Sequence, residues 1–169
     1  MKLRTLSIFA AVALLAACES TPDNKATTSG AGAATQANPP SSSAPSSMVA
    51  PGSVEDFLKN VGDRVFFDFD KSAVTDEGKA TLDKQAAWLK KYPQWAITVE
   101  GHCDERGTRE YNLALGERRA NAVKKYLASV GIADSRLKTI SYGKERPAVQ
   151  GSNDSAWAQN RRGVTVLGQ

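Results

Sequence analysis

The chain has 169 residues with 22 basic and 18 acidic side chains, which give a formal net charge of +4. The opposite charges are interspersed, whereas a nucleic-acid-binding domain needs a clustered basic face, so we expect no nucleic-acid partner. The sequence contains a single histidine, which excludes a histidine-rich metal site; we expect no metal and no dissociable cofactor.

The first predicted element is a signal peptide over residues 1–17. A basic start precedes an apolar run over residues 6–17, which is shorter than the about 20 residues that a membrane-spanning helix needs. The run ends in the letters LAAC at residues 15–18, which resemble the lipobox of bacterial lipoproteins. The resemblance implies cleavage before Cys18 and a covalent lipid on it, S-diacylglycerol with an N-palmitoyl group. Ordinary secretory cleavage, which would leave Cys18 free, is the alternative.

Residues 18–52 are predicted to be a lipidated cysteine followed by a flexible periplasmic linker. The segment is rich in Pro, Ser and Gly and contains no aromatic residue, so it cannot bury enough apolar surface to fold. A flexible chain of this length has a root-mean-square span of roughly 30 to 35 Å. Such a reach suits a domain that must contact something away from the membrane, although a passive spacer is equally consistent.

Glu19 follows the lipobox-like cysteine, whereas Asp at that position is the usual inner-membrane retention signal in enteric-type bacteria. The resemblance therefore implies that the protein is anchored in the outer membrane, with its domain facing the periplasm. Two or more acyl chains hold a protein firmly at a membrane. We expect a tethered protein rather than a spanning one.

One folded domain is predicted over residues 53–169. Ser53 can cap a short helix through Lys59, and residues 64–70 alternate, which predicts a half-buried strand with Val65, Phe67 and Phe69 on one face. Thr75, followed by two acidic residues, predicts the start of a helix that ends near residue 91. A second strand is predicted over residues 95–100.

The longest predicted helix runs from Thr108 to Gly131. A stripe spaced by three and four residues is predicted to face the core: Leu113, Gly116, Ala120, Val123, Leu127 and Val130. Asn112, Leu115 and Arg119 form a parallel stripe one residue to its side. We expect this second stripe at the margin of the buried face, where packing can hold a side chain that still reaches a ligand.

Two further strands are predicted over residues 137–142 and 164–167. A loop containing Pro147 and a short helix near residues 154–159 connect them. The alternation of strands and helices predicts an α+β fold, an α/β sandwich of about four strands with two main helices packed on the sheet.

Asp104, Asp70 and Arg119 form the candidate binding site. Asp104 follows the second strand and Asp70 ends the first, so two parallel neighbouring strands would open both carboxylates on one edge. A carboxylate accepts from an ammonium group and a guanidinium binds a carboxylate through two hydrogen bonds. The pair Asp104 and Arg119 therefore has the chemistry of a receptor for an amino-acid head group, and a salt bridge between them that only stabilises the loop is the alternative.

Several motifs carry a family resemblance: FDFDKS at residues 67–72, VEGHCDERG at 99–107, NxxLGxxRAxxV at 112–123, SYGKERP at 141–147 and NRR at 160–162. They resemble OmpA-like peptidoglycan-binding domains, and most closely the peptidoglycan-associated lipoproteins of the Tol-Pal system. The resemblance covers about residues 55–168. It implies a βαβαβ-type fold that binds the diaminopimelate of the cell-wall stem peptide without a covalent bond.

Carried over by position, the resemblance implies that Asp104 holds the ammonium and Arg119 the carboxylate of the diamino acid. Further ligand contacts are implied for Phe69, Asp70, Asn112, Leu115 and Ala120. Cys103 departs from the Ala or Thr that is common in the family, and we interpret it as a small apolar residue that fills space at the strand end. His102 is interpreted as a hydrogen-bonding residue of the loop, and Glu105 and Arg106 as surface charges.

The implied function is to tether the outer membrane to the cell wall as part of the Tol-Pal system, in envelope integrity and in constriction at cell division. TolB and TolA are the implied protein partners. A protein-interaction hub that binds mainly TolB is the alternative. An enzyme acting through Asp70, Asp104 and Glu105 is disfavoured, because the chain has no Gly-x-Ser-x-Gly motif, no second histidine for zinc and no cysteine beside a base.

Overall fold

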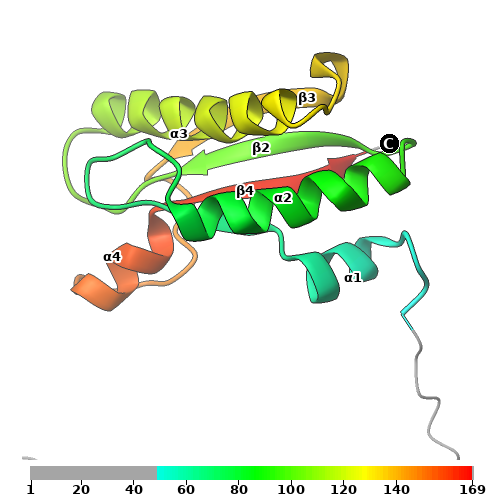
Figure 1. The fold of residues 1–169 in the computed structure, drawn as a ribbon. Coiled ribbons are helices and arrows are strands. Elements are labelled where there is room, and N and C mark those ends of the chain that lie inside the picture. The colour runs from blue at the N-terminus through cyan, green and yellow to red at the C-terminus, as the bar shows by residue number, and fades with distance from the viewer. Residues whose placement is uncertain (1–48, 169) are drawn as a thin grey trace, which may run out of the picture. The chain divides into compact units, whose positions relative to one another are not determined.

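The computed structural model describes residues 49–168. The predicted signal peptide, Cys18 and most of the predicted linker lie outside these residues. Figure 1 shows the elements, whose bounds are α1 Val54–Asp56, the π-helix Phe57–Val61, β1 Arg64–Phe66, α2 Asp76–Lys91, β2 Ala96–His102, α3 Arg109–Ser129, the 3-10 turn Asp134–Arg136, β3 Leu137–Gly143, α4 Asp154–Asn160 and β4 Arg162–Gly168.

The helices begin where side chains can replace the missing backbone hydrogen bonds. Ser53, Thr75 and Thr108 each precede a helix, and their hydroxyls accept from the backbone N–H three residues further on. The first four N–H groups of a helix have no partner inside it, so such caps stabilise the start by about 1 kcal/mol. The predicted starts at these three positions are confirmed.

A single mixed sheet has the strand order β1-β4-β2-β3. β2 pairs with β3 in parallel, while β4 is antiparallel to both β1 and β2. The strands β1 and β2 are therefore not neighbours, but they point in the same direction on either side of β4. Their carboxyl termini therefore lie at the same end of the sheet, as the candidate site requires.

One hydrophobic core joins α2 and α3 to the same face of this sheet. Its fully buried members include Leu82 and Leu89 of α2, Val99 of β2 and Leu127 of α3. Burial of such side chains is the main stabilising contribution to a domain of this size. The α+β fold class is confirmed, with two main helices packed on a four-stranded sheet (Figure 1).

The first strand is shorter than predicted. β1 ends at Phe66, and although Val65 and Phe67 are buried, Phe69 is 58% exposed. Beyond Phe66 the chain turns: Lys71 N–H donates to the Asp68 carbonyl, and Asp70 has a left-handed φ of 58°. A left-handed residue cannot continue a strand, so the alternation predicted through residue 70 is wrong at its end.

The buried face of α3 is wider than the predicted core stripe. Its members Gly116, Ala120, Val123 and Leu127 are buried as predicted. Leu113, predicted in the core stripe, is 46% exposed, whereas Asn112 and Leu115 of the other stripe are buried and Arg119 is 0% exposed. The cause is a close backbone contact in which a Cβ on Gly101 would lie 1.8 Å from the Gly116 carbonyl oxygen. With the Gly116 backbone against β2, both stripes lie close to the sheet, and the residues predicted at the margin are buried.

Candidate functional site

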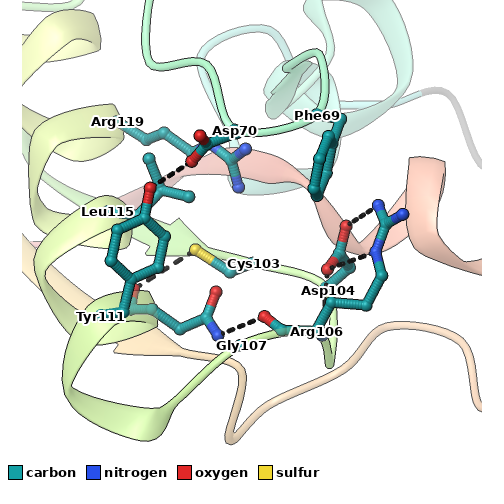
Figure 2. Close-up of a pocket in the computed structure, with 10 residues that line it drawn as sticks. Phe69, Asp70, Cys103, Asp104, Arg106, Gly107, Tyr111, Leu115 and Arg119 are labelled. Carbon is teal, nitrogen blue, oxygen red and sulfur yellow. Dashed lines mark hydrogen bonds and ion pairs between the residues drawn. The ribbon is translucent and has the colours of Figure 1, made fainter.

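A pocket of about 210 Å³ opens past the carboxyl ends of β1 and β2 (Figure 2). The loops that follow the two strands form one side, and the first half of α3 forms the other. The residues that line it are Phe69, Asp70, Cys103, Asp104, Arg106, Gly107, Tyr111, Asn112, Leu115 and Arg119. The structure thus brings together every predicted site residue except Ala120, which is fully buried in the core.

Arg119 is a buried cation in the wall of the pocket. Its Nε donates to the Lys71 carbonyl and its Nη1 to the His102 carbonyl, both at 2.8 Å, and its Nη2 donates to the Asp68 carbonyl at 3.1 Å. These bonds connect the loop after β1 to the end of β2. Burial lowers the pKa of Arg119, yet a guanidinium stays charged in proteins.

No carboxylate of residues 49–168 forms a salt bridge with Arg119. The alternative of an Asp104–Arg119 salt bridge is therefore not what the structure shows. Three carbonyl dipoles solvate the guanidinium, and two of its five N–H donors are left over from these bonds. Buried charges are normally paired. Arg119 is an exception among residues 49–168, because its positive charge in the pocket wall has no anionic partner.

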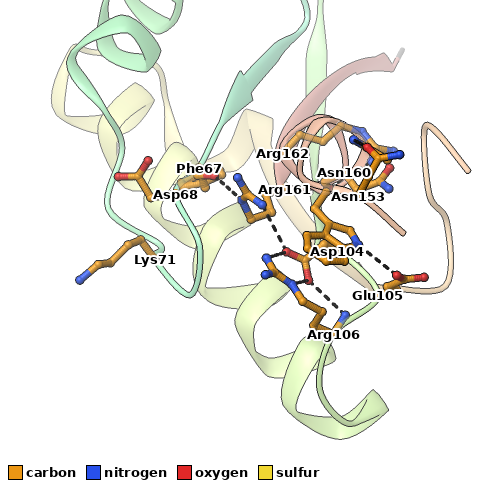
Figure 3. A network of polar contacts seen from close by, with 12 residues as sticks. Phe67, Asp68, Lys71, Asp104, Glu105, Arg106, Asn153, Asn160, Arg161 and Arg162 are labelled. Atoms are coloured by element: carbon orange, nitrogen blue, oxygen red, sulfur yellow. Dashed lines mark hydrogen bonds and ion pairs between the residues drawn. The ribbon is translucent and has the colours of Figure 1, made fainter. Parts of the chain in front are cut away.

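Asp104 is paired with two other arginines, as Figure 3 shows. Arg106 Nη2 lies 2.6 Å from Asp104 Oδ2, and Arg161 Nη1 lies 3.4 Å from the same oxygen. Arg161 is itself held by its Nε, which donates to the Phe67 carbonyl at 3.0 Å. Burial opposes ionisation of Asp104, but the hydrogen bonds from Arg106 outweigh it, and the pKa of this carboxyl is lowered.

Arg106 lies at the surface as predicted, but its charge is not left to solvent alone. Its guanidinium lies between two aromatic rings, 4.0 Å from the ring centroid of Phe69 and 4.1 Å from that of Trp157. Trp157 Nε1 in turn donates to Glu105 at 3.0 Å. The loop residues 104–106 are thus attached to α4 and to the loop after β1.

Asp70 and Tyr111 face each other across the pocket mouth (Figure 2). The Tyr111 hydroxyl donates to Asp70 Oδ1, and this hydrogen bond raises the pKa of Tyr111. Asp tolerates the left-handed conformation better than most residues, and strained backbone of this kind is concentrated at ligand sites. Phe69 and Tyr111 are 58% and 46% exposed and form an aromatic rim.

The remaining pocket residues shape the wall. The Asn112 side-chain amide donates to the Arg106 carbonyl at 2.7 Å and to the Thr108 carbonyl at 3.0 Å, so it holds the loop against α3. Cys103 is 2% exposed with its thiol directed at the Asn112 carbonyl, and burial raises its pKa. Its predicted space-filling role is confirmed.

His102 differs from the prediction. Its ring is 2% exposed, and within residues 49–168 neither ring nitrogen has a hydrogen-bond partner. Glu100 Oε2 lies 3.4 Å from Nε2 without hydrogen-bond geometry. Burial, followed by the nearby charge of Arg162, lowers the pKa of His102 from 6.5 to about 4. The ring is neutral at pH 7, and only the backbone carbonyl serves the site, through Arg119.

Comparison with known proteins assigns the chain to a family. The sequence model of the OmpA family matches residues 66–161. The chain belongs to the OmpA family. The match begins in β1 and ends after α4, so the OmpA-family region contains every residue of the pocket.

Relatives of this OmpA-family chain share a common name. The peptidoglycan-associated lipoprotein of Rhizobium meliloti (strain 1021) is 55% identical over 142 residues, covering 82% of this chain and 81% of the relative. That of Mesorhizobium japonicum is 52% identical, covering 95% of this chain and 90% of the relative. The crystal structure of the peptidoglycan-associated lipoprotein from Burkholderia pseudomallei superposes with a TM-score of 0.62 at 42% identity, covering 66% of this chain and 98% of that one. The names refer to wall association and lipid attachment, not to an enzymatic activity.

Two site residues of this OmpA-family domain were missed by sequence reasoning. Arg106 carries the contact to Asp104, and Tyr111 the contact to Asp70. The only signal for Arg106 was its position two residues after Asp104 in a loop, which does not distinguish a partner from a solvated charge. Tyr111 gave no signal, because its partner is 41 residues away in sequence.

Two further absences bear on the chemistry. Among the helices within residues 49–168, none has the length and apolar character needed to span a bilayer. The same part of the chain contains no group of three or more His, Cys, Asp or Glu side chains placed to hold a metal ion.

Proposed function

We propose that this protein binds peptidoglycan without a covalent bond, by holding the free amino-acid end of diaminopimelate in the pocket between β2 and α3. The observation that carries the proposal is the uncompensated guanidinium of Arg119 in a pocket that also contains the carboxylate of Asp104. A zwitterionic head group supplies the anion that Arg119 lacks and the cation that Asp104 accepts. Relatives named peptidoglycan-associated lipoprotein support peptidoglycan as the larger molecule that is bound.

We propose a partner for each half of the head group. The ligand carboxylate takes the guanidinium donors of Arg119 that no carbonyl uses, and Arg119 is oriented for this by its bonds to the two loops. The ligand ammonium takes an oxygen of Asp104. Asp70, Asn112, Leu115 and the Phe69 ring surround the remaining part of the ligand. Ala120 belongs to the hydrophobic core and does not line the pocket, so we assign it no contact with the ligand.

In the cell, we infer an outer-membrane lipoprotein that tethers the membrane to the wall through a lipid on Cys18. The name of the relatives and the lipobox-like sequence at residues 15–18 support the anchor. Membership of the Tol-Pal system, with roles in envelope integrity and in constriction at division, follows from the resemblance of the motifs. TolB and TolA are the proposed partners.

A protein partner at the same mouth is the second candidate. Exposed aromatic side chains are enriched in protein interfaces, and Phe69 and Tyr111 form such a rim around the pocket. A domain that mainly binds TolB would use this rim and need the wall only secondarily. Capture on purified sacculi, with and without added TolB, separates the two: competition at one surface lowers wall binding, whereas independent surfaces leave it unchanged.

The test of the main proposal is a calorimetric titration of the full-length chain in detergent with meso-diaminopimelate and with Nα-acetyl-lysine amide. This blocked lysine keeps the side-chain ammonium but has no free carboxylate, as in a stem peptide, so Arg119 stays without its anion. Losing one partner of a desolvated charge pair costs on the order of 2 to 5 kcal/mol, or roughly 30-fold or more in affinity. We expect Nα-acetyl-lysine amide to bind at least that much more weakly, and sacculi cross-linked through lysine to be captured poorly.

Variants locate the two contacts. Asp104→Ala and Arg119→Ala should each lose sacculus binding, and the double variant should be far from additive because both residues hold one head group. Arg109→Ala is the matched control, since Arg109 is 69% exposed and pairs only with the half-exposed Glu145. Because Arg119→Ala also removes three hydrogen bonds, Arg119→Lys is measured beside it, with a melting curve for each. A folded Arg119 variant that binds diaminopimelate as well as the unchanged chain refutes the assignment.

A further inference from the structure

The carboxylate proposed to receive the ligand ammonium is already fully occupied. Asp104 Oδ1 accepts from the Arg106 backbone N–H at 3.1 Å and from Arg106 Nε at 3.2 Å. Oδ2 accepts from Arg106 Nη2 at 2.6 Å and from Arg161 Nη1 at 3.4 Å. A carboxylate has about four acceptor positions. No acceptor position remains for a ligand while Arg106 stays where it is.

We propose that Arg106 acts as an internal competitor: its guanidinium occupies the ammonium position of the pocket, and the ligand cation must displace it. The proposal rests on the proposed function, because it takes Asp104 as the acceptor of the ligand ammonium. It assigns Arg106 a role in setting the affinity for cationic ligands rather than a contact with the bound ligand.

The contacts of the three arginines decide which one leaves. Arg161 has a 15% exposed side chain and is also bound to the Phe67 carbonyl, and Arg119 is wholly buried. The side chain of Arg106 is 34% exposed, and its non-covalent contacts are Asp104 and two ring faces. Cation–π contacts of this kind are weak at exposed sites. Arg106 therefore exchanges with solvent most readily.

Displacement of Arg106 lowers the affinity for every ligand that binds through an ammonium group. A simple amine displaces the guanidinium without gaining the contact to Arg119, whereas a zwitterion displaces it and gains that contact as well. The apparent affinity for every cationic ligand is reduced by the fraction of molecules in which Arg106 is out of the way.

The test is Arg106→Gln in the full-length chain, titrated with meso-diaminopimelate in detergent. Removing the competitor should tighten binding on the order of tenfold, the effect of a competing state populated at about nine parts in ten. Arg109→Gln is the matched control and should leave the affinity unchanged, since that exposed side chain pairs with Glu145 outside the pocket. An Arg106→Gln chain that binds equally or more weakly overturns the proposal, because a direct ligand contact by Arg106 predicts weakening.

A second readout follows the side chain itself. The three tryptophans are labelled with 5-fluorotryptophan, and Trp157→Phe assigns the resonance of the ring that stacks on Arg106. Saturating meso-diaminopimelate should move the Trp157 resonance toward its position in Arg106→Gln. Trp88 and Trp95, packed against each other away from the pocket, should stay unchanged. Binding seen by calorimetry without movement of the Trp157 resonance contradicts displacement.

The two proposals fail in different ways. If the unchanged chain binds diaminopimelate but Arg106→Gln does not bind it more tightly, Arg106 is not a competitor and the proposed function stands. If neither chain binds diaminopimelate, both proposals are wrong.

Discussion

Three arginines near one pocket have three different states. Arg119 is buried and bound to carbonyls, Arg161 is anchored to both a carbonyl and Asp104, and Arg106 stacks between two rings at the surface. Burial raises the cost of leaving a charge unpaired. The charge of Arg119 is therefore the one most affected by a ligand anion, while that of Arg106 is the one most easily moved.

His102 predicts a pH dependence of stability. In the folded chain its pKa is lowered to about 4, against 6.5 when unfolded. As the pH falls below about 6.5 the unfolded state binds a proton that the folded state does not, so stability falls between about pH 6.5 and pH 4. The full loss is about 3 kcal/mol, from a pKa difference of this size. Urea unfolding at several pH values measures it.

His102→Gln is the control for that dependence. Since the chain has only one histidine, the variant should show a nearly flat free energy of unfolding between about pH 5 and pH 6.5. The same slope in the variant and in the unchanged chain would show that another group is responsible.

At the scale of elements, the contact between β2 and α3 positions the whole site. The Gly116 carbonyl occupies the space where a Cβ on Gly101 would lie. This contact brings Arg119 of α3 to the carbonyl of His102, the last residue of β2. Two glycines in facing elements therefore determine where the buried guanidinium sits.

Gly101→Ala should destabilise the domain by about 3 kcal/mol, because the new methyl group forces α3 away from the sheet. The shift also moves Arg119, so we expect loss of diaminopimelate binding in whatever fraction folds. Gly168→Ala is the matched control in a strand, where the nearest atom to the new methyl is Ala96 O at 3.9 Å. Urea unfolding of both variants checks the prediction, and equal stability of the two would contradict it.

At the scale of the whole molecule, binding and anchoring are assigned to separate parts of the chain. The pocket lies within residues 69–119, whereas the proposed lipid is on Cys18. A covalent lipid with two or more acyl chains is sufficient to hold a protein at a membrane. Folding of the domain should therefore not depend on the anchor.

Cys18→Ser should abolish membrane attachment while leaving the melting temperature unchanged. Fractionation of membranes freed of peptidoglycan, followed by thermal melting, measures both effects. Cys103→Ala is the control for loss of a thiol, because that cysteine is buried in the domain and should leave attachment intact. Sedimentation of the Cys18→Ser chain with such membranes would exclude the lipid as the anchor.

The sequence by itself determined the helix starts, the succession of strands and helices along the chain, and the α+β fold class. These depend on interactions within a few residues, such as the caps at Thr75 and Thr108, and on the periodicity of apolar residues. It also indicated Asp104 and Arg119 as candidates, because the motifs around them resemble those of a known family. Both residues do line one pocket.

Only the tertiary structure decided the burial of the second stripe of α3, the outward direction of Phe69 and the partner of Asp104. The burial of that stripe follows from the Gly101–Gly116 contact, and the turn after β1 exposes Phe69. The sequence does not show which arginine pairs with Asp104. The candidates Arg106, Arg119 and Arg161 lie 2, 15 and 57 positions from it. The choice among them depends on burial and on the carbonyls nearby, which exist only once the strands and helices are packed together.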